Sequence, residues 1–256
     1  MDITSVANPR IKRLIALRDR KERERESVFI VEGSRDLARA VAHGHQPLEV
    51  YYDPAHFPGP PQRAGTEMSV ATAPLDRASY RGRSQGVIGV FSQFDVTLDH
   101  LAPGPDPLFL MAEAIEKPGN LGALLRTADA VGADALIVAD PDTDPFSPNV
   151  VRASTGAIFS VPMGITDLDA AVSWVRDLKA QIVAADPGTT NLLWDADISG
   201  PLALLVGAED TGLTASARAA ADTIISLPMR GSTDSLNVSV SMAVLAYEAL
   251  RQRRGT

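Results

Sequence analysis

The second part of the chain contains six short apolar runs in which hydrophobic residues do not alternate with polar ones. They are LFLMAEAI (108–115), DALIVAD (134–140), IFSVPM (158–163), AQIVAADP (180–187), LALLVGAE (202–209) and TIISLPM (223–229). Such strands are buried on both faces, as in a parallel sheet that carries helices on each side. Helical patterns separate the runs, and we expect helices at 121–131, 147–154, 167–178, 214–220 and 235–252. The pattern therefore predicts an α/β domain with a mostly parallel sheet.

The first part of the chain alternates strands and helices over shorter lengths. SVFIVEG (27–33), LEVYYD (48–53) and QGVIGVFS (85–92) are strand-like, and SRDLARAVAHG (34–44) has a helical pattern. A stretch rich in Pro and Gly, HLAPGPDPLF (100–109), is typical of a linker, because periodicity stops there. We therefore expect a small α/β domain at 1–103 and a second domain at 104–256.

Composition excludes several classes of function. The chain has no cysteine, which removes disulfides, thiolate nucleophiles and Cys-based zinc sites. Its four histidines all lie in the first 100 residues, so few imidazole ligands are available for a metal site. No run approaches the roughly 20 apolar residues that cross a bilayer, and no secretory signal pattern opens the sequence. We expect a cytoplasmic protein without metal or membrane association.

Charge is divided unevenly along the chain. The net charge is −8, which argues weakly against a nucleic-acid partner. Residues 1–105 nevertheless hold 14 Lys and Arg against 13 Asp and Glu. Eight of these cations gather near the start, at Arg10, Lys12, Arg13, Arg18, Arg20, Lys21, Arg23 and Arg25. Interleaved acids favour a salt-bridged, solvated helix, although the same basic density suits a phosphate backbone.

Polar and glycine-rich loops follow three of the predicted strands, where parallel sheets bind ligands. The first is EKPGNLGALLRTADAVGAD (116–134). Asn120 there suits a helix N-cap and Arg126 suits an exposed helix face, while Gly119 and Gly122 would admit a substrate backbone.

The other two loops lie nearer the end of the chain. LLVGAEDTGLT (204–214) places Gly207 directly after a buried strand, but it lacks the GxGxxG pattern of dinucleotide-binding folds and alone suggests a structural turn. ISLPMRGSTDSLNVSVSMAV (225–244) offers more capping residues than one helix needs. Small residues then recur at Ser239, Ser241 and Ala243, which favours close packing of another backbone or a flat ligand.

Together these loops resemble a known family. In order, spacing and context, NLGALLRTADAVGA, LLVGAEDTGL and LPMRGSTDSLNVSVSMAV resemble motifs 1, 2 and 3 of the SpoU (TrmH-like) RNA 2′-O-ribose methyltransferases of the SPOUT superfamily. PFSPNVVRASTGAIFSVP resembles the segment between motifs 1 and 2. NPRIKRLIALRDRKERERESVFIVEGSRDLARAV and SQGVIGVF resemble the substrate-binding domain of members that act on ribosomal RNA, so the resemblance covers nearly the whole chain.

The resemblance implies both a fold and an activity. It implies a SPOUT domain with a deep trefoil knot, an exception to the rule against threaded chains, preceded by an L30e-like RNA-binding domain. It implies S-adenosylmethionine as cofactor, a homodimer with a composite active site, and methyl transfer to a ribose 2′-hydroxyl of 23S ribosomal RNA. A transfer RNA substrate and a catalytically inactive RNA-binding paralogue are the alternatives; an unrelated nucleotide-dependent enzyme is disfavoured because phosphate-loop motifs are missing.

The same resemblance assigns roles to individual residues. The catalytic set comprises Asn120, Arg126, Glu209, Ser235 and Asn237. The cofactor set comprises Gly207, Leu227, Met229, Ser235 and Leu236, and the substrate set comprises Arg10, Lys12 and Arg152. The chain departs from the family pattern at Asp210, where glycine is common, and at RSQG (83–86), which lacks the usual His-Pro.

Arg126 has two candidate roles in this chemistry. A ribose 2′-hydroxyl is too weakly acidic to ionise at neutral pH, so the site must align the oxygen and handle its proton. The family proposal makes the arginine a general base. Since a guanidinium stays protonated in proteins, stabilisation of developing negative charge is the better physical interpretation.

Overall fold

The computed structural model describes residues 3–57 and 65–254, which form two compact units. Unit 1 comprises Met1–Phe94 and Asp144–Ser160, and unit 2 comprises Asp95–Thr143 and Val161–Thr256. The chain therefore leaves unit 1 at Phe94 rather than near the expected position 103. It also returns to unit 1 for Asp144–Ser160, a segment that the sequence placed wholly in the second domain.

Unit 1 is a small α/β unit, as predicted. Its elements are α1 (Pro9–Ala16), α2 (Arg20–Glu26), β1 (Val28–Glu32), α3 (Ser34–Ala42), β2 (Glu49–Tyr52), β3 (Thr66–Ser69), α4 (Thr72–Ala78), β4 (Val87–Ser92), α6 (Pro148–Ser154) and the 3₁₀ turn η2 (Ala157–Phe159). The strands form one sheet in the order β1-β4-β2-β3. Only β2 and β3 pair in parallel; the other two pairings are antiparallel.

The basic segment near the start forms two short helices rather than one. Asn8 caps α1 ahead of Pro9, and Asp19 caps α2. Most arginines of this segment are ion-paired, as the salt-bridged interpretation expected. The pairs are Arg13 with Glu26 and Glu49, Arg20 with Glu24, and Arg25 with Glu22 and Glu26.

A buried ion pair fixes the returning segment within unit 1. Arg23 is only 3% exposed at its side chain, and its guanidinium pairs with Asp144 through two nitrogen atoms, Nε lying 3.1 Å from Oδ2. Its Nη1 atom also donates to the carbonyls of Leu17 and Arg18, at 2.8 and 2.7 Å. Because every donor group of this guanidinium has a partner, the buried charge is compensated.

Unit 2 is built on a six-stranded sheet. Its elements are η1 (Leu98–His100), β5 (Leu108–Glu113), α5 (Pro118–Val131), β6 (Ala135–Ala139), β7 (Met163–Thr166), α7 (Leu168–Asp177), β8 (Gln181–Ala185), η3 (Leu193–Asp195), β9 (Leu202–Val206), α8 (Ala215–Ala220), β10 (Thr223–Ile225) and α9 (Val238–Arg253). The strand order is β10-β8-β9-β5-β6-β7, and every pairing is parallel.

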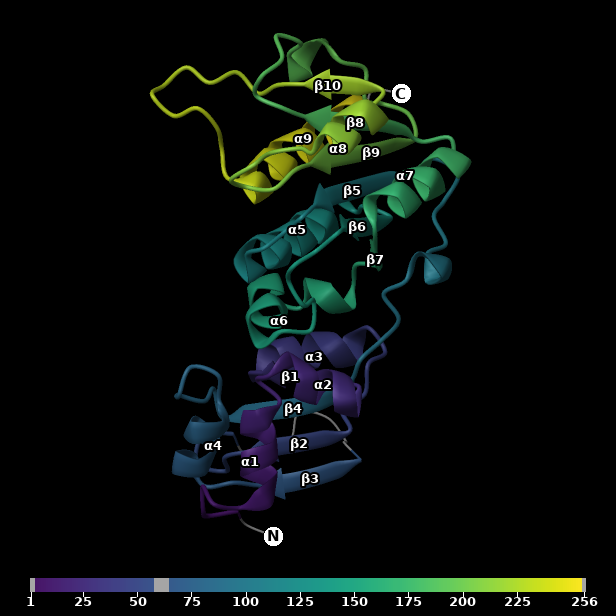
Figure 1. Cartoon of the computed structure of the whole chain (residues 1–256). Helices are drawn as coiled ribbons and strands as arrows, with labels where there is room; N and C mark the ends of the chain where they lie inside the picture. Colours follow the sequence, from purple (N-terminus) through teal and green to yellow (C-terminus); the bar gives the residue numbers. More distant parts are fainter. Residues whose placement is uncertain (1–2, 58–64, 255–256) are drawn as a thin grey trace. The chain divides into compact units, whose positions relative to one another are not determined.

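Helices cover both faces of this sheet, which explains why its strands are apolar throughout. Helices α5 and α9 pack together, against β6 and β9, while α7 and α8 pack on the opposite face (Figure 1). Every residue of β5, β6 and β9 is buried. No helix among the described residues is long and apolar enough to cross a membrane.

Three predicted boundaries in this part were wrong, for local reasons. The run IFSVPM is not a strand: Ala157–Phe159 forms a 3₁₀ turn, and β7 begins at Met163, because a short buried apolar run fits either state. Helix α5 begins at Pro118, so Asn120 lies in its first turn and is not the cap. Helix α9 begins at Val238, not at 235, and Asn237 is its N-cap. The knot and the L30e-like class stay predictions.

Replacing Arg23 by methionine tests the anchor of the returning segment. The Met side chain keeps most of the buried volume but leaves the Asp144 carboxylate and two carbonyls without their partner. We expect a loss of about 3 kcal/mol in the unfolding free energy of the first transition in urea, followed by circular dichroism. Arg20→Met, which removes an exposed pair with Glu24, is the control and should cost at most about 0.5 kcal/mol. Equal losses in the two variants would contradict the anchor.

Candidate active site

Three predicted catalytic residues from different parts of the chain meet in one hydrogen-bond network in unit 2. Asn120 comes from the first turn of α5, Glu209 from the loop after β9, and Asn237 from the start of α9. The Nδ2 atom of Asn237 donates to Asn120 Oδ1 at 3.1 Å and to Glu209 Oε1 at 3.2 Å. Asn120 Nδ2 donates to Glu209 Oε2 at 3.2 Å. The network therefore ties together the three loops that follow β5, β9 and β10.

The Glu209 carboxylate is the centre of this network. Its Oε2 atom also accepts from Lys117 Nζ at 2.5 Å, so both carboxylate oxygens are occupied. The hydrogen bond from Lys117, together with those from Asn120 and Asn237, holds the pKa of Glu209 below its ordinary value. In turn, the hydrogen bond to Glu209 raises the pKa of Lys117. A carboxylate with a lowered pKa is a weak base, so Glu209 is poorly suited to accept a proton at neutral pH.

Asn237 serves the network and the helix together. Its Oδ1 atom accepts from the backbone N of Ser239 at 3.0 Å and from Ser239 Oγ at 2.7 Å, which caps α9. Its Nδ2 atom is thereby turned toward Asn120 and Glu209. An amide side chain can cap the helix and join the network together, because it carries an acceptor oxygen and two donor hydrogens.

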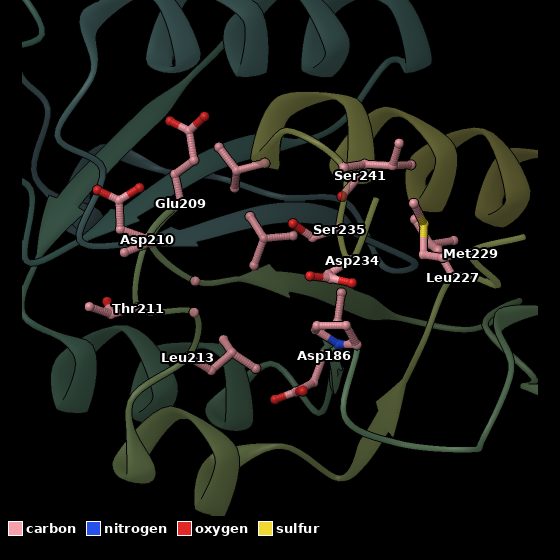
Figure 2. A pocket seen from close by; sticks show the side chains of 18 of the residues that line it. Asp186, Glu209, Asp210, Thr211, Leu213, Leu227, Met229, Asp234, Ser235 and Ser241 are labelled. Atoms are coloured by element: carbon pink, nitrogen blue, oxygen red, sulfur yellow. The ribbon is translucent and has the colours of Figure 1, made fainter. Parts of the chain in front are cut away.

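A cavity of about 350 Å³ lies beside the network. Figure 2 shows its labelled side chains arriving from the loops after β8, β9 and β10 and from the first turns of α9. All five predicted cofactor residues line it: Gly207, Leu227, Met229, Ser235 and Leu236. Glu209 lines it as well, so the network and the cavity share a wall.

Gly207 is required by the protein's own backbone. A Cβ atom at this position would lie 2.3 Å from the carbonyl carbon and oxygen of Gly212 and 2.4 Å from Leu213 N. The loop folds back so tightly that Ala208 and Gly212 exchange two backbone hydrogen bonds, of 3.0 and 3.1 Å. Gly212 has a φ of +68°, which side-chain-bearing residues rarely adopt. Asp210, the departure from the family pattern, sits at the tip of this turn and lines the cavity.

Other predicted site residues lie outside the network. Ser235 lines the cavity, but its side chain makes no hydrogen bond with the network among the described contacts. Arg126 is exposed on α5, and no hydrogen bond or ion pair of its side chain occurs in the part of the chain that the structure describes. Arg10, Lys12 and Arg152 belong to unit 1 and do not line the cavity.

Sequence reasoning missed several residues of the site. Lys117 lies in the first loop (116–134) but was assigned no role, and Asp186 with Pro187 lines the cavity from the loop after β8. Asp186 is buried and forms an ion pair with Arg218, another lining residue. Strand β8 is a direct neighbour of β9, so the rule that ligands bind beyond carboxyl strand ends would have pointed to its loop as well.

The cavity suits a medium-sized ligand with apolar and cationic parts. Its volume falls within the roughly 300–1,000 Å³ of ordinary small-molecule sites. Leu213, Leu227 and Leu236 give it apolar walls, while Asp210 and Asp234 place carboxylates at its edge. The backbone of the 207–212 turn also faces the cavity. Because Gly207 has no side chain, a ligand can approach this backbone closely. A flat base joined to an amino-acid cation, which is the chemistry of S-adenosylmethionine, fits these surroundings.

Comparison with known proteins assigns the chain to a family. Residues 107–247 match the sequence model described as the SpoU rRNA Methylase family. This protein belongs to that family. Residues 8–89 match a second model, the MRM3-like substrate binding domain.

Relatives of this protein match it over nearly its full length. A Streptomyces viridochromogenes protein named 23S rRNA (uridine(2479)-2′-O)-methyltransferase is 31% identical over 93% of this chain and 87% of its own length. The solved structure of an RNA 2′-O ribose methyltransferase superimposes with a TM-score of 0.89 at 40% identity, covering 99% of this chain and 100% of the other. An AdoMet-bound rRNA methyltransferase from Sinorhizobium meliloti gives 0.88 at 28% identity, covering 98% and 97%.

Lys117→Met should shift the titration of Glu209. Because Lys117 is the largest cause of the lowered pKa, its removal should raise that pKa toward the ordinary value, which carboxyl ¹³C NMR of the labelled protein can follow. The network needs the charged carboxylate, so it is intact above the Glu209 pKa and lost as pH falls through it. In Lys117→Met that loss should begin at higher pH. Lys179→Met, an exposed lysine elsewhere in unit 2, is the control; an unmoved Glu209 titration in Lys117→Met would refute the coupling.

Gly207→Ala tests the tight turn. The added methyl overlaps the Gly212 backbone, so the turn must open, at a cost of roughly 1–3 kcal/mol in unfolding free energy. Because the turn forms a cavity wall, S-adenosylmethionine affinity measured by calorimetry should fall at least about tenfold. Gly200→Ala, where a Cβ meets nothing within 4 Å, should leave both quantities unchanged. Wild-type affinity in Gly207→Ala would contradict this assignment.

Proposed function

We propose that this protein transfers a methyl group from S-adenosylmethionine to a ribose 2′-hydroxyl of 23S ribosomal RNA. The observation that carries the proposal is the network of Asn120, Glu209 and Asn237, which joins three motif loops beside a cavity of about 350 Å³. Membership of the SpoU rRNA Methylase family and the names of full-length relatives support the reaction and the RNA class.

The cavity residues would bind the cofactor. Bound S-adenosylmethionine supplies a methyl group on a sulfonium, which is already an activated leaving group, so the proposed reaction needs no metal. Leu227, Met229 and Leu236 would enclose its apolar parts, and the turn at Gly207 would offer backbone groups at close range. Asp234 and Asp210 carry charge of the sign that favours a cationic ligand.

The network would position the reacting groups. Glu209 holds Asn120 and Asn237 at fixed places, and Lys117 keeps it ionised. In this arrangement Asn120 presents its amide between the loop after β5 and the cavity wall, where it can orient the ribose. Glu209 would not act as the base, since its pKa is lowered; as the O–CH₃ bond forms and the S–CH₃ bond breaks, the hydroxyl proton would pass to solvent water.

Arg126 would stabilise the negative charge that develops on the ribose oxygen, and it would do so for the neighbouring protomer of a homodimer. Its exposed guanidinium lies outside its own chain's network, so it is available to another chain. Helix α9 carries exposed apolar side chains on one face, at Val240 and Tyr247, seven residues apart. Such a face is what a partner helix would cover.

Two alternatives differ in substrate or in activity. A transfer RNA substrate is disfavoured because residues 8–89 match a substrate-binding domain, which family members acting on transfer RNA usually lack. A catalytically inactive RNA-binding paralogue would have no need to keep the bonded network of Asn120, Glu209 and Asn237. Removal of unit 1 would not separate these cases cleanly, because Asp144–Ser160 folds with it.

Arg126→Ala tests the reaction. Methyl transfer to ribosomal RNA should fall by at least about 100-fold, because a charge-stabilising group is removed from the transition state. S-adenosylmethionine affinity should stay within about twofold of wild type, since Arg126 does not line the cavity. Arg254→Ala, which removes an exposed arginine at the end of α9, is the control. Undiminished turnover in Arg126→Ala would overturn the assigned role, and an inactive wild type with intact cofactor binding would overturn the function.

Mixed dimers extend the same test to the composite site. Leu227→Arg places a cation in the cavity wall and should abolish cofactor binding. If Arg126 serves the partner's cavity, dimers reassembled from equal amounts of Arg126→Ala and Leu227→Arg chains should recover about one quarter of wild-type activity. Half of the dimers are then mixed, and each holds one intact site. No recovery would reject the composite site.

A further inference from the structure

Tyr80 is an aromatic residue that unit 1 leaves exposed. It follows α4 in the turn Ser79–Gly82, which is closed by a 3.0 Å hydrogen bond from Gly82 N to Ser79 O. Its side chain belongs to the few large apolar ones that stay in solvent, with 40% of the residue surface exposed. Tyr80 plays no part in the network or the cavity of unit 2.

The turn that carries Tyr80 is fixed by hydrogen bonds to the side chains of Arg18 and Glu32. Arg18 Nη2 donates to the carbonyls of Arg77, Ala78 and Ser79, at 2.6, 3.1 and 2.6 Å. The Glu32 carboxylate accepts from Tyr80 N at 2.7 Å and from Ser79 Oγ at 2.8 Å. An exposed ring on a preorganised backbone loses little freedom on binding, which is the usual property of a recognition residue.

The ring is also oriented at its far end. Asn149 Nδ2, from α6, donates to the Tyr80 hydroxyl at 2.9 Å. The hydroxyl proton has no acceptor among the described residues, so it is available to a ligand. Arg152 lies across a hollow beside the ring, but that hollow holds only about 10 Å³. A nucleobase cannot enter so small a space and would have to lie on the exposed ring instead.

The arginines around Tyr80 form no ion pairs in the part of the chain that the structure describes. Arg77, Arg81 and Arg83 are exposed, and within the described residues none of them, nor Arg152, forms a side-chain ion pair or hydrogen bond. The nearby acids are already engaged. Glu32 binds the turn, Asp36 is buried against Arg35, and Asp76 Oδ1 accepts from Ser84 N at 2.7 Å. Four arginines of the basic helices differ from these, because Arg13, Arg20, Arg23 and Arg25 are each paired with an acid.

We propose that Tyr80 is a stacking platform for one unpaired base of the RNA substrate, with Arg81 and Arg83 binding the adjacent phosphates. Stacking on an aromatic side chain next to arginines is how proteins bind single-stranded RNA, whose bases are free of their helical neighbours. The proposal rests on the proposed function, since it assigns part of the same substrate to unit 1. It adds the turn after α4 to the predicted RNA contacts at Arg10, Lys12 and Arg152.

The charge of this surface favours RNA over a protein partner. Three exposed arginines that form no ion pair with the described residues would meet repulsion or costly desolvation at most protein surfaces, whereas a phosphate chain supplies one negative charge per nucleotide. This concentration of free cations occurs in a chain whose net charge is −8, so it is not a general property of the protein. A protein partner would use the apolar area of the ring rather than its stacking geometry, and side-chain replacements distinguish the two.

Steady-state methylation of 23S ribosomal RNA by full-length variants tests the stacking. Tyr80→Ala should raise the KM for RNA roughly 10- to 100-fold, in keeping with the loss of one stacked base, while kcat and S-adenosylmethionine affinity stay within about twofold. Tyr80→Phe keeps the ring and should lose only the hydroxyl contact, about threefold or less. Tyr80→Leu keeps apolar bulk without a stacking face and should resemble Tyr80→Ala. Wild-type KM in Tyr80→Ala, or in Tyr80→Leu, would overturn the proposal; the second result would show that apolar bulk at this position suffices without a stacking face.

Salt dependence tests the phosphate contacts separately. Binding of a fluorescent 12-nucleotide oligouridylate is measured at several salt concentrations. The double variant Arg81→Gln, Arg83→Gln should lower the slope of log Kd against log salt by about 1.4, since each single-strand phosphate contact contributes roughly 0.7. Arg20→Gln, whose guanidinium is already paired with Glu24, should leave the slope unchanged. Equal slopes in all three proteins would refute the assignment.

The two kinds of failure are distinguishable. If wild type methylates no ribosomal RNA, the proposed function fails, yet the oligonucleotide titration still decides whether Tyr80 and its arginines bind a single strand. If methylation is normal in wild type and in Tyr80→Ala, the proposed function stands and the stacking site is rejected. Thermal unfolding of each variant should match wild type, because the replaced side chains are exposed.

Discussion

The Glu209 carboxylate holds the candidate active site together. It accepts hydrogen bonds from Lys117 and Asn120, which follow β5, and from Asn237, which follows β10, while Glu209 itself follows β9. Without that one negative charge, Asn237 would keep its helix cap and its hydrogen bond to Asn120, but both amides would lose their hydrogen bonds to the loop after β9. The geometry of the cavity wall therefore depends on a partly exposed ionic interaction, which is weaker than the apolar sheet beneath it.

The sequence was sufficient to predict the sheet and the positions of its functional loops, because strands buried on both faces leave a pattern that few other structures share. It could not predict the state of Ile158 and Phe159, since burial selects apolar residues in a 3₁₀ turn as well as in a strand. The division into units also escaped prediction. Arg23 and Asp144 lie 121 positions apart, and nothing in either local sequence indicates that they pair.

Most residues of the site could be predicted from the sequence, but the hydrogen bonds between them could not. Asn237 has the local pattern of a helix cap, which it is, and only the fold shows that the same amide also reaches Asn120 and Glu209. Gly207 was assigned to cofactor contact, but the close approach of Gly212 already requires a glycine there. Lys117 was missed because an exposed lysine carries no signal until its partner is known.

The excursion of Asp144–Ser160 into unit 1 has a consequence for the order in which the chain can fold during synthesis. Domains generally fold as they leave the ribosome, the earlier one first. Here the earlier unit needs residues that emerge only after β5, α5 and β6 of the later one have been made. Arg23 therefore has no counter-ion from Asp144 until more than a hundred further residues have been translated. Recombination at residue 95 that exchanged only the first matched family segment would therefore separate Arg23 from Asp144.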